Sequence, residues 1–481
     1  MMTHLARIIP ARWVSPKTIW EYTEIVFHKQ NVNSCASRAC RYLLPLSCLA
    51  VRLTAQPDPS ELLLRAREKV LNTLDRLPRY MCTQTIDRSV YAIRREVEPK
   101  ACDDPQRSPD SKRKLERTMA DRVRLDVGIA ARGEIYSWVG ESRFRNRSLF
   151  SIVNEGSMST GYFNGFLDLV FRSDNTIFSY SGEVSEGGRK LIEYSYRQPL
   201  EGSHYDFLFH GQSVTTGYEG TVLVDPETAE LIRLTLGTSS IPAETGACAV
   251  NNTMSYSRFR LNGSDFLLPS ETHLHITGQN GVETDNLTVY SGCHEFLGES
   301  KLSFEAPLDV PDKESTAPRS EVTIPAGLPF RLSLAEDIQV ATAAAGDPIK
   351  AVLTTDLRDQ SKKVLVPKGT PVLCRILRIR RLYFQGTAAR PLDFDNLSAR
   401  VELLLGLENF ALPGGQRPVY AQPDRGRIAS PPKAGTLQSR PMELGPLNAM
   451  GRSQWFSTFP RAGDDYVIKS GLASSWVTVA P

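Results

Sequence analysis

The spacing of apolar residues changes from a helical period to a strand period near residue 78. Before this point, apolar residues recur three or four positions apart, at Leu63, Ala66, Val70, Leu74 and Leu77. Asp58 fits a helix N-cap, Pro59 the first helical position and Glu61 the third. Pro78 ends the pattern. The sequence therefore predicts one leading helix with a single apolar face.

From residue 80 onward, apolar and polar residues alternate in short runs that turn residues separate, and such runs are typical of strands. They cover residues 81–93, 122–130, 134–139, 177–184, 190–196, 204–209, 213–218, 221–224, 231–236, 255–261, 272–277 and 283–290. Two Asn-Gly pairs, at 262–263 and 280–281, predict tight hairpins. Two short helices are expected at residues 148–153 and 162–171. About ten to twelve antiparallel strands cannot stay flat, so we predict a mainly β domain, with the helix packed on a curled half-barrel.

A proline-rich, charged stretch at residues 306–319 reads as a linker to a second β domain. Strand patterns in that domain cover residues 321–334, 349–357, 364–367, 372–382, 394–405, 466–469 and 476–479. Residues 411–450 hold seven prolines and predict a long irregular excursion. The expected domains are thus a leader at 1–55, a half-barrel domain at 56–305, the linker, and a second, smaller barrel-like domain at 320–481.

The first 55 residues resemble an export signal. An apolar stretch at residues 42–51 follows Arg38 and Arg41, and small residues end it at Ala55. The stretch is too short for a spanning helix, which needs roughly 20 residues. We expect export to the periplasm or the periplasmic face of the outer membrane, with cleavage near Ala55. The alternatives are a short buried helix, or lipidation at Cys48, whose preceding Pro45 is unusual in a lipidation motif.

The net charge of the chain is informative only when the leader at 1–55 is counted separately. The whole chain carries 57 Lys and Arg against 54 Asp and Glu, but residues 56–481 carry 50 against 52. A net charge of −2 gives no basic footprint for nucleic acid. The basic run at residues 112–114, with Arg117, is expected to be a solvated loop or a contact for anionic headgroups or a protein.

Five cysteines remain after the leader, so at least one thiol must be free: Cys82, Cys102, Cys248, Cys293 and Cys374. None of them forms a CxxC pair, which argues against a zinc ribbon or a thioredoxin-like site. Cys82 and Cys293 lie in the first and last strands of the half-barrel domain. A disulfide between them would close a long loop and stabilise the fold by about 4 kcal/mol, although spacing alone leaves other pairings open.

No motif of known chemistry occurs in the mature chain. His273 and His275 share one face of a strand and His294 follows on the next, which is a candidate metal site, but solvent-facing histidines are the commoner explanation. The segment HEFLG at 294–298 lacks the second histidine of a zinc protease, and nucleotide-binding loops and nucleophile elbows are absent. We therefore expect no catalytic residue, no metal and no cofactor.

Aromatic residues crowd the centre of the first domain and supply the candidate binding residues: Tyr136, Trp138, Phe163, Phe166, Phe178, Tyr194 and Phe207. An apolar pocket would use such residues, because burying an acyl chain yields about 0.8 kcal/mol per CH₂. An ordinary β core uses them too. Tyr194 and Tyr196 are two positions apart and should share one face of their strand.

The order of elements and three segments resemble the LolA, LppX and RseB group of exported bacterial proteins over residues 57–305. The segments are residues 74–88 (LDRLPRYMCTQTIDR), 134–141 (EIYSWVGE) and 220–234 (GTVLVDPETAELIRL). The resemblance implies an unclosed β-barrel with a helix as lid and an apolar cavity that carries acyl chains or lipids, or that senses the envelope through a partner. Residues 320–382 more faintly resemble a TrbI-type β-barrel, through IPAG at 324–327, AGDPIKAVL at 345–353 and VPKGT at 366–370.

These observations favour a non-enzymatic envelope protein. Its first domain would bind a hydrophobic ligand, either a lipid or a lipidated partner, and its second domain would dock to other envelope components. The alternative is a structural or sensory interaction protein with a filled, ligand-free barrel. A metal-dependent enzyme is the third possibility.

Overall fold

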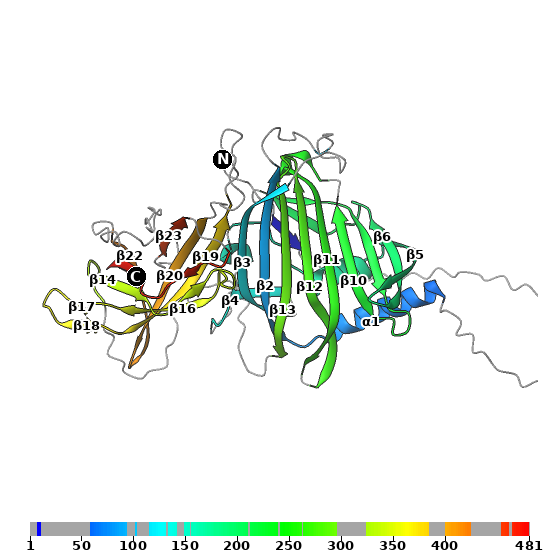
Figure 1. Ribbon diagram of the computed structural model, residues 1–481. Helices are drawn as coiled ribbons and strands as arrows, with labels where there is room; N and C mark the ends of the chain where they lie inside the picture. Colours follow the sequence, from blue (N-terminus) through cyan, green and yellow to red (C-terminus); the bar gives the residue numbers. More distant parts are fainter. Residues whose placement is uncertain are drawn as a thin grey trace, which may run out of the picture.

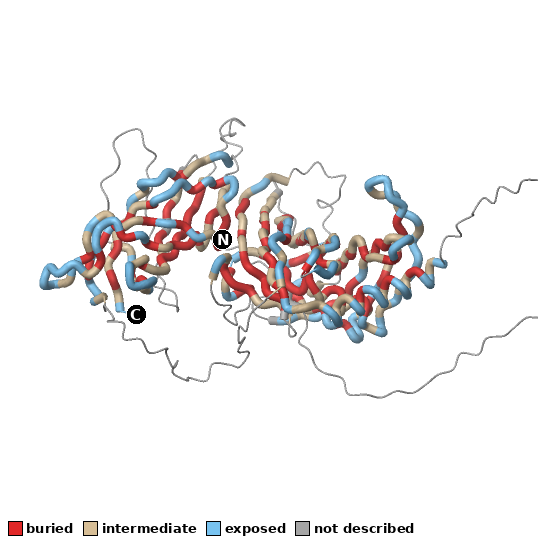
Figure 2. The backbone as a smooth tube through the Cα atoms, turned by 90° about the horizontal axis from the view of Figure 1, so that it is seen from below, coloured by how far each residue is buried: buried red, intermediate tan, exposed pale blue. Residues whose placement is uncertain are grey.

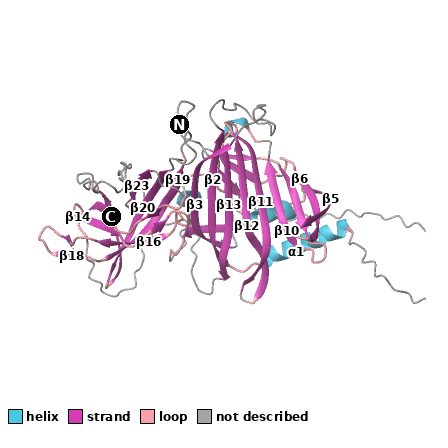
Figure 3. Cartoon of the chain, viewed as in Figure 1, coloured by secondary structure: helices cyan, strands magenta, loops and turns pink. Residues whose placement is uncertain are grey.

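The computed structural model describes residues 7–10, 58–93, 102, 115–130, 133–141, 149–153, 155–209, 212–238, 241–261, 263–295, 324–383, 400–424, 454–460 and 464–480. The chain is mainly β, as predicted, and forms two β domains that lie side by side (Figure 1). The helices are few and belong to the first domain (Figure 3). Apart from the β1 tetrapeptide, the 1–55 leader, the linker at 306–319 and the basic run at 112–114 lie outside the described residues.

The leading helix is α1 (Pro59–Arg76), and its start is the one that the sequence predicts. The side chain of Asp58 accepts a hydrogen bond from the Ser60 N–H at 2.8 Å, so it caps the helix. The fully buried row is Leu62, Ala66 and Val70. Leu63, expected in that row, is only partly buried. Leu62 precedes Ala66 and Val70 by exactly four and eight residues, so it lies at the centre of the helix face that meets the sheet, and Leu63 lies at its border.

The first domain contains twelve strands besides the N-terminal β1 (Arg7–Pro10). They are β2 (Tyr80–Ile93), β3 (Leu115–Ala130), β4 (Gly133–Trp138), β5 (Ile177–Glu186), β6 (Arg189–Gln198), β7 (Tyr205–Phe209), β8 (Gln212–Thr215), β9 (Tyr218–Val224), β10 (Leu231–Thr238), β11 (Ala247–Leu261), β12 (Ser264–Gly278) and β13 (Glu283–Glu295). Three short helices and one 3-10 turn complete it: α2 (Leu149–Ile152), α3 (Gly165–Leu167), the π-helix η2 (Asp168–Arg172) and η3 (Ala243–Thr245).

Ten of these strands form one antiparallel sheet in the order β5-β6-β9-β10-β11-β12-β13-β2-β3-β4. The sheet curls into the half-barrel that the sequence predicts (Figure 1). Buried residues follow its inner wall and alternate with exposed ones along the strands (Figure 2). The turn between β11 and β12 falls at the first predicted hairpin, with Leu261 paired to Ser264.

The strand expected at 204–209 does not join the main sheet. It is β7, which pairs with β8 and with β1 in a separate three-stranded sheet. The side chains of Tyr205 and Phe207 are buried, and the Tyr205 ring packs across the interior against Phe166 of α3 and Tyr218 of β9. This packing places β7 over the interior of the domain and not within the wall. β1 belongs to the segment expected to be a leader.

The second domain has its own core and twelve strands. They are β14 (Pro329–Leu334), β15 (Ile338–Gln339), β16 (Pro348–Leu353), β17 (Leu357–Arg358), β18 (Val364–Val366), β19 (Pro371–Leu382), β20 (Arg400–Leu412), β21 (Gly415–Pro418), β22 (Ala421–Pro423), β23 (Gln454–Pro460), β24 (Val467–Ile468) and β25 (Ala473–Thr478). β14, β16, β19 and β20 follow one another, and β21 and β22 connect β20 to β25, which returns to β14. Phe330, Phe410 and Trp476 pack together at the centre. Residues 411–424, where the irregular excursion is expected to begin, hold the end of β20 and the strands β21 and β22. The rest of the expected excursion, residues 425–450, lies outside the described residues.

The second domain completes the edge of the first. The edge of β3 that β4 leaves uncovered pairs with the second domain. Residues 119–121 of β3 pair with residues 380–382 of β19, and Val123 forms a bridge with Ala345. The Arg124 N–H donates to the Ala345 carbonyl at 2.7 Å, and the Ala345 N–H donates to the Arg122 carbonyl at 2.8 Å. We call this contact the seam. It leaves almost no free edge on β3, because β4 covers the remaining residues.

Candidate binding site in the first domain

The inner wall of the half-barrel is built from alternate residues of each strand. Directly opposed residues of antiparallel strands share a face, and Ile86 opposes Val123 while Leu125 opposes Trp138. The inward residues are mostly apolar and fully buried, and α1 packs against them with Leu62. The wall therefore offers a concave apolar surface, as expected from the alternation in sequence.

All the predicted binding residues lie in this interior or at its rim. Six of them are at most 5% exposed: Tyr136, Trp138, Phe163, Phe166, Tyr194 and Phe207. Phe178 is only partly buried and packs against the others. Their role in ligand binding remains a prediction, because the same burial suits a core.

The aromatic rings of the interior touch one another in separate groups, one around Phe163 and one around Phe166. Phe163 lies 4.8 Å from Tyr290 and 5.7 Å from Tyr80, measured between ring centroids. In the other group, Phe166 lies 5.3 Å from Tyr162 and 6.1 Å from Tyr205. Trp138 stands apart at the seam, where a Cβ added to Gly346 would lie 3.0 Å from its ring.

The interior is filled by residues 149–153 and 155–172, which we call the plug. It includes α2, α3 and η2, and none of these helices is longer than five residues. Residues 157–163 are buried without interruption. The sequence predicts the two helical parts of the plug but not this buried middle, whose signal is a stretch rich in small hydroxyl residues, SMSTG at 157–161, between two apolar stretches.

Small hydroxyl side chains occupy the middle of the plug. The Oγ atoms of Ser157 and Ser159 are buried and have no hydrogen-bond partner in the described part of the chain. Each such unpaired hydroxyl costs about 1–3 kcal/mol. The plug thus fills the half-barrel at a cost that an apolar segment of the same size would avoid.

Glu134 fastens the plug to the wall. Its carboxylate accepts hydrogen bonds from the N–H groups of Gly161 at 2.7 Å and Phe163 at 3.0 Å, and from the Tyr136 hydroxyl. Burial raises the pKa of the Glu134 carboxyl above its ordinary value, and these hydrogen bonds offset the rise only in part. Sequence reasoning missed Glu134, because an acidic residue beside a hairpin turn reads as solvent-facing.

A second carboxylate ties the plug to the second domain. The Glu155 side chain pairs with Arg378 and, at 3.2 Å, with Arg380, both on β19. Its backbone carbonyl accepts a hydrogen bond from Arg88, which forms a buried ion pair with Asp121 at 2.5 Å. Plug, wall and second domain therefore meet at Glu155.

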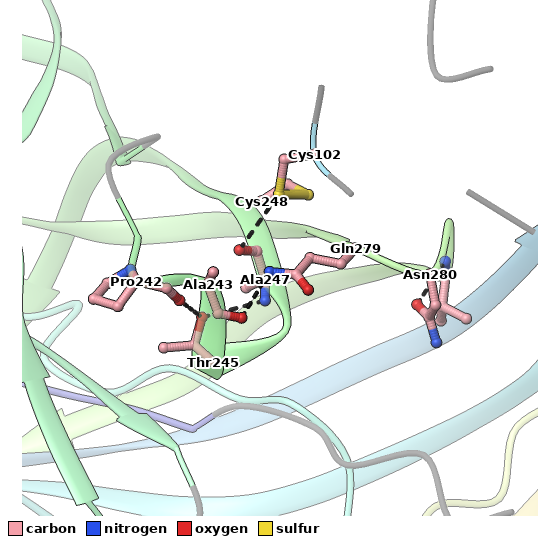
Figure 4. The surroundings of a disulfide bond; sticks show 9 residues. Cys102, Pro242, Ala243, Thr245, Ala247, Cys248, Gln279 and Asn280 are labelled. Atoms are coloured by element: carbon pink, nitrogen blue, oxygen red, sulfur yellow. Dashed lines mark hydrogen bonds between the residues drawn. A yellow bond between two sulfur atoms is a disulfide. The ribbon is translucent and has the colours of Figure 1, made fainter. Parts of the chain in front are cut away.

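Two disulfides constrain the first domain. Cys82 and Cys293 are bonded, which is the pairing expected from their places in the first and last strands of the domain. Cys102 and Cys248 form the second bond, beside η3 and the start of β11 (Figure 4). The remaining thiol, Cys374, is buried in the second domain, and burial raises its pKa to about 12. A thiol held protonated in this way is a poor nucleophile.

The histidines do not converge. His273 pairs with Asp285 and His275 with Glu283 on the outer face, while His294 bonds the carbonyl of Gly292 at another place on the sheet. Within the described ranges, no group of three or more His, Cys, Asp or Glu residues is arranged to hold a metal ion. None of the helices in the described ranges has the length and apolar character to span a membrane.

No protein-family model matches the chain, and no curated protein matches it. Among solved structures, it is similar to a DUF1329 family protein from Desulfovibrio piger over 50% of this chain and 97% of that one, with 12% identity and a TM-score of 0.26. A LolA superfamily protein from Nitrosomonas europaea matches over 49% and 93%, with 11% identity and a TM-score of 0.22. The lipoprotein LppX from Mycobacterium tuberculosis matches over 50% and 99%, with 8% identity and a TM-score of 0.18. The last two are of the LolA and LppX kind named in the sequence resemblance.

Proposed function

We propose that this chain is a non-enzymatic protein of the cell envelope that binds the apolar part of a lipid, or of a lipidated partner, inside the first domain. The plug is the observation that carries the proposal. It covers an apolar wall with short helical turns and small hydroxyl residues, two of which lack partners in the described ranges. An acyl chain could take the place of the plug without disturbing the sheet. The hydroxyls of Ser157 and Ser159 would then reach water, and the free-energy cost of burying them unpaired would be removed.

The second domain is proposed to dock the first to other envelope components. Its sheet is joined to the first through the seam, so a force or a partner acting on one domain reaches the other. Its own interior is packed by Phe330, Phe410 and Trp476, which favours a docking role over a second ligand cavity.

A protein-interaction module without a ligand is the second candidate. The ring contacts of Phe163 and of Phe166 favour it, since they fill the half-barrel with the chain's own residues. The two candidates differ in whether the plug leaves the interior under native conditions.

Native mass spectrometry of the chain purified from the envelope, followed by solvent extraction, separates them. We expect a stoichiometric apolar adduct on the wild type and its loss in Phe207→Asn. Ile177→Asn is the matched control, because Ile177 is 62% exposed on β5. Phe178→Asn, at a partly buried rim position, serves if Phe207→Asn fails to fold. Protein that carries no adduct and takes up no offered lipid would favour the interaction module.

Export is tested separately by N-terminal sequencing of the chain recovered from the periplasm. Cleavage near Ala55 should give a mature protein that begins at about residue 56. A recovered chain that keeps residues 7–10, where β1 pairs with β7, would contradict a cleaved leader.

A further inference from the structure

Four neighbouring strands present buried side-chain oxygens that have no hydrogen-bond partner among the described residues. They are the Tyr80 hydroxyl on β2, the Tyr256 hydroxyl on β11, Thr272 Oγ1 on β12, and Asn286 Oδ1 and the Tyr290 hydroxyl on β13. Each of these residues is at most 6% exposed. Buried polar atoms are normally paired, so five on one wall form a feature that needs an explanation.

These oxygens lie close together under the plug. The Phe163 ring packs against both Tyr80 and Tyr290. Thr272 opposes Thr288 on β13, two residues from both Asn286 and Tyr290 on the same face. Asn286 also uses its Nδ2 atom to bond the plug carbonyl of Ser157 at 2.7 Å, so its Oδ1 faces the same interior. The Tyr162 hydroxyl of the plug and the Tyr290 hydroxyl lie near Thr272 Oγ1, but neither pair has the geometry of a hydrogen bond.

The charges around the group restrict what it could bind. Arg88, the cation on this wall, already forms two hydrogen bonds with Asp121 at 2.5 and 2.7 Å. Glu134 adds a carboxyl group at the same end of the interior. A phosphate or carboxylate head would therefore find no available cation on the described wall and would meet an acidic group. Hydroxyl and amide oxygens suit neutral partners that donate and accept hydrogen bonds.

We propose that the five oxygens form a binding site for the neutral, oxygen-rich head of an amphiphile, such as a glyceryl ester, whose acyl chain occupies the aromatic part of the interior. This inference rests on the proposed function, since the head reaches the strands only when the plug moves away. It adds a preference for neutral over anionic heads that an apolar cavity alone would not have.

The test compares three ligands with one oleoyl chain: monooleoylglycerol, oleoyl lysophosphatidylglycerol and oleate. Each is titrated into the full mature chain below its critical micelle concentration, and binding is followed by calorimetry. Wild type should bind monooleoylglycerol about tenfold more tightly than either anionic ligand. Tyr290→Phe combined with Thr272→Val removes two hydroxyls at nearly constant volume and should weaken monooleoylglycerol binding about thirtyfold, which corresponds to about 2 kcal/mol for two lost hydrogen bonds.

Tyr180→Phe is the matched control, because Tyr180 is 53% exposed and its loss should leave all three affinities unchanged. Thermal unfolding checks that each variant folds, and the single variant Tyr290→Phe replaces the double one if it does not. Wild type and double variant with equal affinities for all three ligands would overturn the headgroup site and leave the proposed function standing. Failure of all three ligands to bind wild type would overturn the proposed function, and this inference with it.

Discussion

Glu134 shows how one carboxyl group couples the plug to pH. An acid whose pKa is higher in the folded chain than in the unfolded chain favours folding while it is protonated. The contribution of Glu134 is therefore fully present below its ordinary pKa of 4.5 and is lost as the pH rises through its raised value in the folded chain.

The prediction concerns the difference between wild type and Glu134→Gln in the free energy of unfolding, measured with urea from pH 4 to pH 8. The stability of wild type relative to this variant should fall as the pH rises above about 4.5. Glu227→Gln, at an exposed turn between β9 and β10, should show no such trend. A wild-type advantage that grows with pH would contradict the assignment.

Much of the residue-level picture could be predicted from alternation. Tyr194 and Tyr196 are expected to share a face, and both are buried. The unpaired oxygens could not be predicted, because a tyrosine in a strand reads as core whether or not its hydroxyl finds a partner. The importance of Glu134 depends on Gly161 and Phe163, which are distant in sequence and meet it only after folding.

At the scale of elements, the plug is the part whose position depends most on contacts with the rest of the chain. Its helices are too short to be stable alone, so its position depends on tertiary contacts such as those of Glu155 with Arg378 and Arg380. These pairs are partly exposed, and together they stabilise the closed plug by only about 1 kcal/mol.

Glu155→Gln should therefore raise hydrogen exchange of the amides at residues 157–163 about fivefold, while the amides of β11 and β12 keep their rates. Glu186→Gln removes a comparable pair with Arg233 away from the plug and should leave plug exchange unchanged. Equal plug exchange in wild type and Glu155→Gln would show that the second domain does not hold the plug.

Elements with a local signal were predicted well. The α1 start at Asp58 and the turn before β12 each follow from neighbouring residues. β7 was misplaced because its alternation resembles that of a wall strand, and only the long-range packing of Tyr205 and Phe207 separates it. The same limit hid the buried middle of the plug.

At the scale of the whole molecule, Arg375 joins the two domains. It lies in the second domain, bonds Glu408 there, and donates to the carbonyls of Gly346 at 2.6 Å and of Val139 at 2.8 Å. Val139 belongs to the first domain. One planar guanidinium thus serves three acceptors, which a lysine ammonium cannot do in the same geometry.

Arg375→Lys should lower the free energy of unfolding by about 2 kcal/mol, because it gives up contacts of a buried charge. The exchange rates of the seam amides of Arg124 and Ala345 should rise with it, as should that of the Tyr383 amide, which donates to the Thr118 carbonyl of β3 at 2.9 Å. Arg358→Lys, at the end of the short strand β17, is the control. Seam amides that keep their protection would show that Arg375 is not the joint between the domains.

The seam also has a mechanical consequence. Its hydrogen bonds run crosswise between β3 and β19, so a pull along the strands would strain all of them at once, as in a lap joint. A pull at right angles would open them one after another, as a zipper opens. The molecule should thus resist tension along its strands much better than peeling across them, and the direction in which an anchored partner pulls would decide whether the two domains stay joined.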